Sequence, residues 1–272
     1  MEKLSIKKLL SLFDKKFLKD VFEIDLKNEE VVISAMKLCT KLNILSLNDL
    51  ISEDEFIKCK VLGKKEIVGK ELILKNARIA LALNLARNVK CKEFNEKALK
   101  SSLNLLKEES RSREFHIIDR LKKILSECGV KLIVLPYLAK SHIRGFTKYD
   151  KEKNYYIVAI NDCGKALDKF FFTLFHELSH ILYGKEVEMN VTSNKKRFIN
   201  EEKFIDYKAQ NLLIKDEEFN KFILKNNLSI NAIYFFANKV RVDASLVIGR
   251  LQNEGYISYS TYTKYKRRID CL

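Results

Sequence analysis

Long apolar runs, paired cysteines and proline are the features that this 272-residue chain lacks or nearly lacks. No apolar run reaches the ~18 to 20 residues that a membrane-spanning helix needs. The N-terminal stretch MEKLSIKK has no apolar core of the kind found in signal peptides. The six cysteines include no C-x-x-C pair, which excludes zinc-ribbon and thioredoxin-type motifs. We therefore expect a cytoplasmic protein whose cysteines are reduced and mostly buried.

Several catalytic signatures are missing as well. The first 110 residues contain no histidine and no glycine-rich phosphate loop, and no acidic cluster predicts a magnesium site, which disfavours a nucleic-acid enzyme. The formal net charge of +15 indicates attraction to an acidic partner, usually nucleic acid. Lysine is spread along the whole chain, however, and the one compact basic cluster, Lys264–Arg268, is interpreted as a solvated helix face. Nucleic acid is thus not the favoured partner.

The first part of the chain has a helical pattern. Hydrophobic residues make up 47% of the sequence, which is enough for a proper core. They recur at helical spacing in the segments 5–18, 31–45, 76–88 and 93–106. Residues 1–110 are therefore predicted to form a helical region, whose chemistry the sequence does not reveal.

Strand patterns appear after a helix predicted over Phe115–Cys128. Residues 131–135 are apolar and β-branched, and Pro136, the only proline, ends that strand. Residues 143–147 and 155–160 are interpreted as two further strands joined by a polar turn. The sequence thus predicts an α+β fold in which a small sheet precedes the most informative motif of the chain.

That motif lies in KFFFTLFHELSHILYG, residues 169–184, an apolar stretch interrupted by His176, Glu177 and His180. It has the form H-E-x-x-H. Residues four apart lie on one face of a helix, so both imidazoles can bind one zinc ion, and catalytic zinc sites leave the fourth position to water. Glu177 is then placed to deprotonate that water. The flanking residues leave almost no polar face, so we expect the helix to be buried and to end at Gly184.

Two histidines and a water leave one protein ligand to be found, and no histidine follows the motif. The candidates are Glu186, Glu188, Glu201, Glu202 and Asp206. Residues 200–214 have the pattern of a helix, and Glu202 falls on its apolar stripe whereas Glu201 falls toward the edge. A carboxylate aimed at a core needs a partner, which a metal would supply. This favours Glu202 but leaves Glu201 open. Asp206, one turn later, can accept the spare N–H of a ligand histidine.

Several segments resemble the ImmA/IrrE family of zinc metallopeptidases: FTLFHELSHIL at 172–182, IRGFT at 143–147 and IVAIN at 157–161. The family pattern continues with a helix of the form E-x-x-A-D-x-F-A-x-x-L-L-I-P, and EKFIDYKAQNLLI at 202–214 fits it without a gap. The resemblance places the glutamate ligand of the family on Glu202 and its acidic partner on Asp206. It implies a zincin-like metallopeptidase core with Zn²⁺ as cofactor.

The sequence departs from the family pattern at four positions. Ser179 stands where the family usually has Gly, Ile205 replaces Ala, Lys208 replaces Phe and Lys215 replaces Pro. None of these changes removes a ligand or the base. Activity is therefore expected, and the substrate preference stays open.

The resemblance also implies three regions. A helical region at 1–110 would precede a zincin-like metallopeptidase domain at 111–225, and a second helical region would follow at 226–272. Members fused to a repressor carry an N-terminal helix-turn-helix, which is not recognisable here.

A second helix-turn-helix pattern spans Ile230–Gly255. Such a motif reads DNA only if its second helix offers polar side chains outward, and the candidates are Ser245, Arg250, Gln252 and Asn253. The high apolar content of both helices favours packing against the protease core instead.

The expected reaction is hydrolysis of a peptide bond, with a repressor or antitoxin protein as the substrate that the resemblance implies. An edge strand beside a metal site can bind an extended peptide by adding its backbone to the sheet. The candidate substrate contacts are therefore the strand residues Arg144, Gly145, Phe146 and Thr147.

A donor for the tetrahedral oxyanion is also needed. The candidates, chosen only by their proximity in the sequence, are Tyr149, Tyr155, His142 and Tyr183. The alternative function is a non-catalytic regulatory protein of antitoxin type, in which the protease fold is a scaffold that binds DNA or a protein partner.

Overall fold

The computed structural model of the chain describes residues 10–13, 15–25, 28, 30–42, 70–113, 116–136, 143–184, 189–193 and 199–269. Its helices are α2 (Lys15–Phe22), α3 (Val31–Leu42), α5 (Lys70–Arg87), α6 (Glu96–Glu108), α7 (Ile117–Glu127), α8 (Leu167–Tyr183), α9 (Ile199–Leu213), α10 (Asp216–Leu224), α11 (Ile230–Lys239) and α12 (Ala244–Asn253). Its strands are β1 (Val130–Leu135), β2 (Ile143–Asp150), β3 (Tyr155–Asn161) and β4 (Met189–Ser193). Short 3-10 helices cover Glu109–Arg111, Cys163–Lys165 and Thr263–Tyr265. The α+β class expected from the sequence is confirmed.

The four strands form one mixed sheet in the order β1-β3-β2-β4. β1 runs parallel to β3, whereas β2 is antiparallel to both β3 and β4. β2 and β3 form the expected hairpin, with Asn154 of the connecting turn at a φ of 49°. The fourth strand, β4, was not predicted from the sequence.

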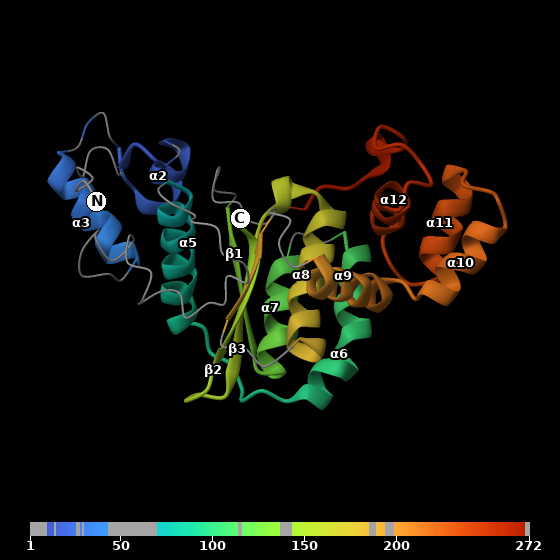
Figure 1. Cartoon of the computed structure of the whole chain (residues 1–272), viewed down its shortest axis with the longest axis horizontal. Helices are drawn as coiled ribbons and strands as arrows, with labels where there is room; N and C mark the ends of the chain where they lie inside the picture. The colour runs from blue at the N-terminus through green and yellow to red at the C-terminus, as the bar shows by residue number, and fades with distance from the viewer. Residues whose placement is uncertain are drawn as a thin grey trace.

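Alternation along the strands sends side chains to two different cores, since successive residues of a strand point to opposite faces of the sheet. Val130 and Leu132 of β1 belong to the larger core, which contains α6 to α12. Ile133 and Leu135 of the same strand belong to a smaller core with α2, α3 and α5. Figure 1 shows the result, with α5 on one side of the sheet and α7 and α8 on the other.

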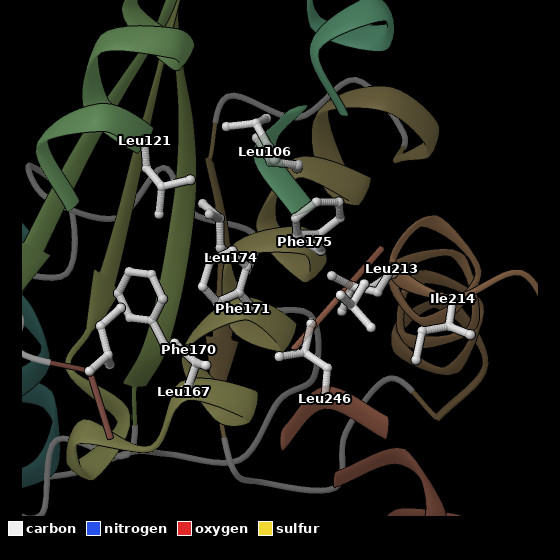
Figure 2. Close-up of a cluster of buried hydrophobic side chains, with 14 of the residues drawn as sticks. Leu106, Leu121, Leu167, Phe170, Phe171, Leu174, Phe175, Leu213, Ile214 and Leu246 are labelled. Atoms are coloured by element: carbon white, nitrogen blue, oxygen red, sulfur yellow. The ribbon is translucent and has the colours of Figure 1, made fainter. Parts of the chain in front are cut away.

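Helix α8 lies at the centre of the larger core. It packs against β2 and β3 on one side and against α9 and α12 on the other. Figure 2 shows its apolar side chains between the sheet and the helices that follow. Those that are fully buried are Leu167, Phe170, Phe171, Leu174, Phe175 and Leu178. The expectation of a buried helix is thus confirmed, and the functional groups of this helix sit inside the protein.

The C-terminal end of α8 is at Gly184. Its backbone leaves the helical conformation at Gly184, whose N–H donates to the His180 carbonyl at 3.0 Å. A Cβ at this position would lie 2.4 Å from that carbonyl oxygen, so glycine is the residue that fits. The prediction that Gly184 ends the helix is therefore confirmed.

The N-terminal helices attach to the sheet through α5. Arg78 of α5 donates to the Pro136 carbonyl at 2.9 Å, and Lys131 of β1 donates to the Ala86 carbonyl at 3.0 Å. The buried Lys131 ammonium also lies 4.0 Å from the ring centroid of Tyr155. One expected helix, over residues 5–18, is wrong in extent, because the chain turns at residues 11–13 before α2 begins.

The C-terminal helices pack into the same core as α8. Leu246 and Leu251 of α12 are buried there, together with Ile233 of α11. Leu99 of α6 belongs to that core too, so the core extends beyond both proposed region limits, 110/111 and 225/226. The three-region division stays a prediction.

Two expectations about strands and charges are wrong. β2 is not an edge strand, because β4 pairs with the side of it that β3 leaves open. The basic cluster Lys264–Arg268 is not a solvated helix face: Lys266 pairs with Asp168 at 2.5 Å and Arg267 with Asp243 at 2.9 Å.

Three of the four polar residues of α12 that were candidates for reading DNA are turned into the protein. Ser245 and Gln252 are buried, and Arg250 is 8% exposed while it pairs with Asp216 and Glu254. Only Asn253 of the four candidates is exposed. The packing of these helices against the core follows the interpretation that their apolar content favoured. No described helix is both long and apolar enough to cross a membrane.

Candidate metal centre

Two histidines of α8 face each other one turn apart. Nε2 of His176 and Nε2 of His180 are 3.1 Å from each other, and the rings meet edge to face with centroids 4.8 Å apart. Their exposed fractions are 3% and 8%. The i, i+4 spacing of the motif thus places two imidazole nitrogens at one point inside the protein.

Helix α9 brings a carboxylate to the same point. Oε2 of Glu202 lies 3.2 Å from Nε2 of His176, and Oε1 lies 3.6 Å from Nε2 of His180. One turn further along α9, Asp206 Oδ1 is 2.8 Å from the other nitrogen of His176, Nδ1. Glu201 is not part of this group, and Glu186 and Glu188 lie outside the described residues.

The three donor atoms have the separations that a tetrahedral ion requires. With ligand bonds of about 2.1 Å, the edges of a zinc tetrahedron measure about 3.4 Å, and the observed distances of 3.1, 3.2 and 3.6 Å bracket that value. Among the described residues, His176, His180 and Glu202 are the one group of three or more metal-binding side chains that meet in this way. A metal ion therefore fits this donor set, and one coordination position would remain for water or substrate.

The electrostatic environment of the two histidines favours a cation. Burial lowers the pKa of His176, but hydrogen bonds to Asp206 and Glu202 outweigh it and raise the pKa to about 10. Burial and the neighbouring His176 charge lower the pKa of His180 to about 4. A site whose carboxylates stabilise a positive charge on an imidazole also favours a metal cation in that place.

Asp206 orients His176. Its bond to Nδ1 makes that nitrogen the donor and turns Nε2 toward Glu202 and His180. A carboxylate behind a metal-binding imidazole fixes its tautomer and raises its basicity. Asp206 therefore has the position that the spacing along α9 predicts.

Glu177, between the histidines, is completely buried and rests against β2. Its Oε2 accepts a hydrogen bond from the Thr147 hydroxyl at 2.7 Å. A Cβ on Gly145 would lie 2.5 Å from its Oε1, so only glycine leaves room for the carboxylate there. Two alternate residues of one strand therefore shape the site of the carboxylate, as the period of a strand allows.

This arrangement divides the residues expected to bind substrate. Gly145 and Thr147 contact Glu177, whereas Phe146 points to the opposite face of the sheet and is buried in the smaller core. Arg144 is exposed. Sequence reasoning missed the support that Gly145 and Thr147 give to Glu177, although the alternation of the strand could have indicated their shared face.

None of the tyrosines offered as oxyanion donors is clearly aimed at the metal centre. Tyr155 lies in the smaller core, Tyr149 donates to Asn154 at 2.9 Å, and the Tyr183 ring lies 4.9 Å from the Lys208 ammonium. His142 lies outside the described residues. The oxyanion donor stays unassigned.

Comparison with known families identifies the segment that carries this centre. Residues 126–252 match the Peptidase_M78 family, described as the IrrE N-terminal-like domain. The match covers 127 of the 272 residues. The resemblance to the ImmA/IrrE family is therefore confirmed over this part of the chain.

The matched segment runs from the last turn of α7 into α12 and contains His176, Glu177, His180, Glu202 and Asp206. Its zincin-like α+β architecture agrees with the sheet and the central helix. No curated protein sequence matches the chain. The family is one of peptidases, and the donor geometry of the domain is that of a metal centre.

Exchange of the carboxylate ligand tests the metal centre. Glu202→Ala should lower the affinity for zinc by well over the ten- to hundredfold typical of losing a residue behind a ligand, because it removes a donor atom itself. Zinc content after dialysis and competition with a chromophoric chelator measure the change. Glu201→Ala, one residue earlier on α9, is the matched control and should retain zinc; loss of zinc from Glu201→Ala instead would place the ligand there.

Proposed function

We propose that this protein is a zinc-dependent endopeptidase. One observation carries the proposal: a fully buried carboxylate, Glu177, lies on the same helix turn as two histidines that meet a glutamate from α9. A purely structural metal site needs closed coordination and no adjacent base. Here three protein donors leave a position open, and a base lies next to them.

Zinc is proposed because two imidazoles and one carboxylate are a donor set that it prefers in hydrolases. When bound, zinc lowers the pKa of water to about 7 and polarises a carbonyl group. His176, His180 and Glu202 would hold the ion, and Asp206 would keep His176 in the tautomer that presents Nε2.

Glu177 is the proposed general base. It would accept the proton of the attacking water and pass it to the leaving amine when the peptide bond breaks. Thr147 donates to Oε2 and Gly145 lies against Oε1, so both oxygens of the carboxylate have defined positions. A base held in this way needs little reorganisation before proton transfer, which is the benefit of a preorganised site.

The proposed substrate is a regulatory protein of the repressor or antitoxin type, cleaved in the cytoplasm to relieve transcriptional control. The family resemblance supports this class of substrate, and the net charge of +15 supports an acidic partner. The competing function, a non-catalytic scaffold that binds DNA or a partner, is less well supported, since the polar residues of α12 are mostly turned into the protein.

Exchange of the base tests catalysis directly. Glu177→Gln keeps the size and the Thr147 contact but cannot accept a proton, so cleavage should fall by about 10² to 10⁴-fold with zinc content unchanged. The substrate is first identified as the protein that co-purifies with the Glu177→Gln protein. Its cleavage by the parent enzyme and by each variant is then followed by mass spectrometry. Glu201→Gln removes the same charge from an adjacent helix and should leave the rate unchanged. Equal rates for Glu177→Gln and the parent would exclude the enzyme hypothesis.

The role of Thr147 is positioning, and it has a separate test. Thr147→Val removes the hydroxyl that binds Glu177 while keeping the shape of the side chain. We expect kcat to fall by roughly tenfold, the effect of about one lost hydrogen bond to a charged group, with KM and zinc affinity unchanged. Thr147→Ser restores a hydroxyl and should recover most of the rate; a Ser variant as slow as the Val variant would mean that packing, not the hydrogen bond, is responsible.

A further inference from the structure

A cavity of about 750 Å³ opens beside the metal centre. It lies between α8, α9, α12 and the segment 259–266, and we call it the α12 pocket. Leu213, Ile214 and Leu246 form part of its apolar wall, and all three are labelled in Figure 2. Its volume is within the roughly 300 to 1,000 Å³ typical of ligand sites.

The α12 pocket adjoins the metal centre on three elements. Phe172 of the pocket precedes His176 by one turn of α8, and their ring centroids are 6.2 Å apart. Gln210 of the pocket follows Asp206 by one turn of α9. Arg144 lines the pocket from β2, at the β-bulge between Ile143 and Gly145. On both helices the pocket wall therefore begins about one turn, ~5.4 Å along the helix axis, from the metal centre.

Some of the cations that line the pocket have carboxylate partners and others do not. Arg250 is neutralised by Asp216 and Glu254, and Lys266 is paired with Asp168. Two further lining cations, Arg144 and Lys169, are exposed and form no ion pair with the described residues. The rim thus carries two cations that can receive a carboxylate.

A buried acceptor complements these cations. Asp168 is 8% exposed, and while its Oδ2 binds Lys266, its Oδ1 accepts no hydrogen bond from the described residues. A buried carboxylate oxygen without a hydrogen bond is costly in free energy, and an N–H donor from a ligand would remove that cost. The pocket therefore offers an apolar wall, a cationic rim and a buried acceptor.

We propose that the α12 pocket binds a segment of the polypeptide substrate in which an acidic residue stands beside apolar ones. The proposal rests on the proposed function and adds the substrate preference. An extended peptide advances ~3.3 Å per residue, so a residue one or two positions from the bond held at the metal reaches the pocket. Apolar side chains contact Leu213 and Leu246, a carboxylate meets Arg144 and Lys169, and a backbone N–H is available to Asp168. A simple fatty carboxylate has no N–H to donate to Asp168, so this acceptor favours a peptide.

Peptide selection on the inactive enzyme tests this preference. Short random peptides are selected on the full chain carrying Glu177→Gln and loaded with zinc, and the retained sequences are read. We expect enrichment of Asp or Glu next to apolar residues. Selection of peptides without acidic residues would overturn the proposal.

Charge reversal at the rim locates the binding. Added to Glu177→Gln, the double change Arg144→Glu and Lys169→Glu should weaken the selected peptides by roughly tenfold or more in a fluorescence titration. The matched control, Lys123→Glu with Lys225→Glu, makes the same change in net charge at exposed residues outside the pocket and should have less than about a twofold effect. Equal weakening by both pairs would mean attraction by overall charge only and would overturn the assignment.

Two further experiments distinguish a peptide ligand from a small carboxylate, and the pocket proposal from the proposed hydrolysis. If 4-phenylbutanoate, an apolar carboxylate without an N–H, displaces the peptides as well as unlabelled peptide does, the pocket takes small carboxylates and the polypeptide assignment is wrong. The parent enzyme should cut the selected peptides within about two residues of the acidic position. Peptides that bind through the rim but are not cut would refute the proposed hydrolysis alone, and peptides cut equally by the Arg144→Glu, Lys169→Glu enzyme would refute the pocket alone.

Discussion

Three ionisable side chains on one turn of a buried helix are the constraint on which this structure depends. His176, Glu177 and His180 are between 0% and 8% exposed. Polar groups buried without partners cost several kcal/mol, so each has to meet a partner from another element. Asp206 and Glu202 meet the histidines from α9, and Thr147 meets Glu177 from β2. The docking of α9 and β2 against α8 is therefore part of the chemistry of the site as well as of the fold.

Patterns that are local in the sequence predicted the parts of the fold that lie close together in the chain. The strands β1, β2 and β3 and the helix α8 follow from alternation, β-branching and an apolar run around H-E-x-x-H. The apolar stripe of α9 favoured Glu202, and the family resemblance strengthened that choice. These elements and the choice of Glu202 could be predicted because residues at a fixed spacing lie on the same face of a helix or strand.

Features that depend on distant segments were not predictable in this way. β4 is a short, polar strand, and its pairing with β2 joins residues 41 to 50 positions apart, so the edge-strand expectation for residues 143–147 was wrong. The helix expected at 5–18 is wrong in extent because its apolar spacing continues across a turn. Phe13 and Phe17 are both buried, although residues 11–13 form a turn and α2 begins only at Lys15. Lys266 and Arg267 looked like a solvated charge run because their partners, Asp168 and Asp243, are remote in the sequence.

The C-terminal helices complete the surroundings of the metal centre. α12 covers α8 with Leu246 and Val247 and closes one side of the α12 pocket, so a helix that resembles half of a DNA-reading motif is used here as a wall. The buried Ser245 supports this role, since its hydroxyl accepts the Arg267 backbone N–H at 2.8 Å and fixes the following segment. Residues beyond α9 thus line the α12 pocket, although none of them belongs to the donor set.

X-ray absorption spectroscopy at the zinc edge of the full chain is the most direct test of the metal centre. The donor set of two histidines and a glutamate predicts one zinc ion per chain, coordinated by nitrogen and oxygen at about 2.0 to 2.2 Å, with an imidazole signature and no sulfur. A sulfur shell at about 2.3 Å would show that cysteines hold the ion. A chain that takes up no stoichiometric zinc would contradict the claim that His176, His180 and Glu202 form a zinc site.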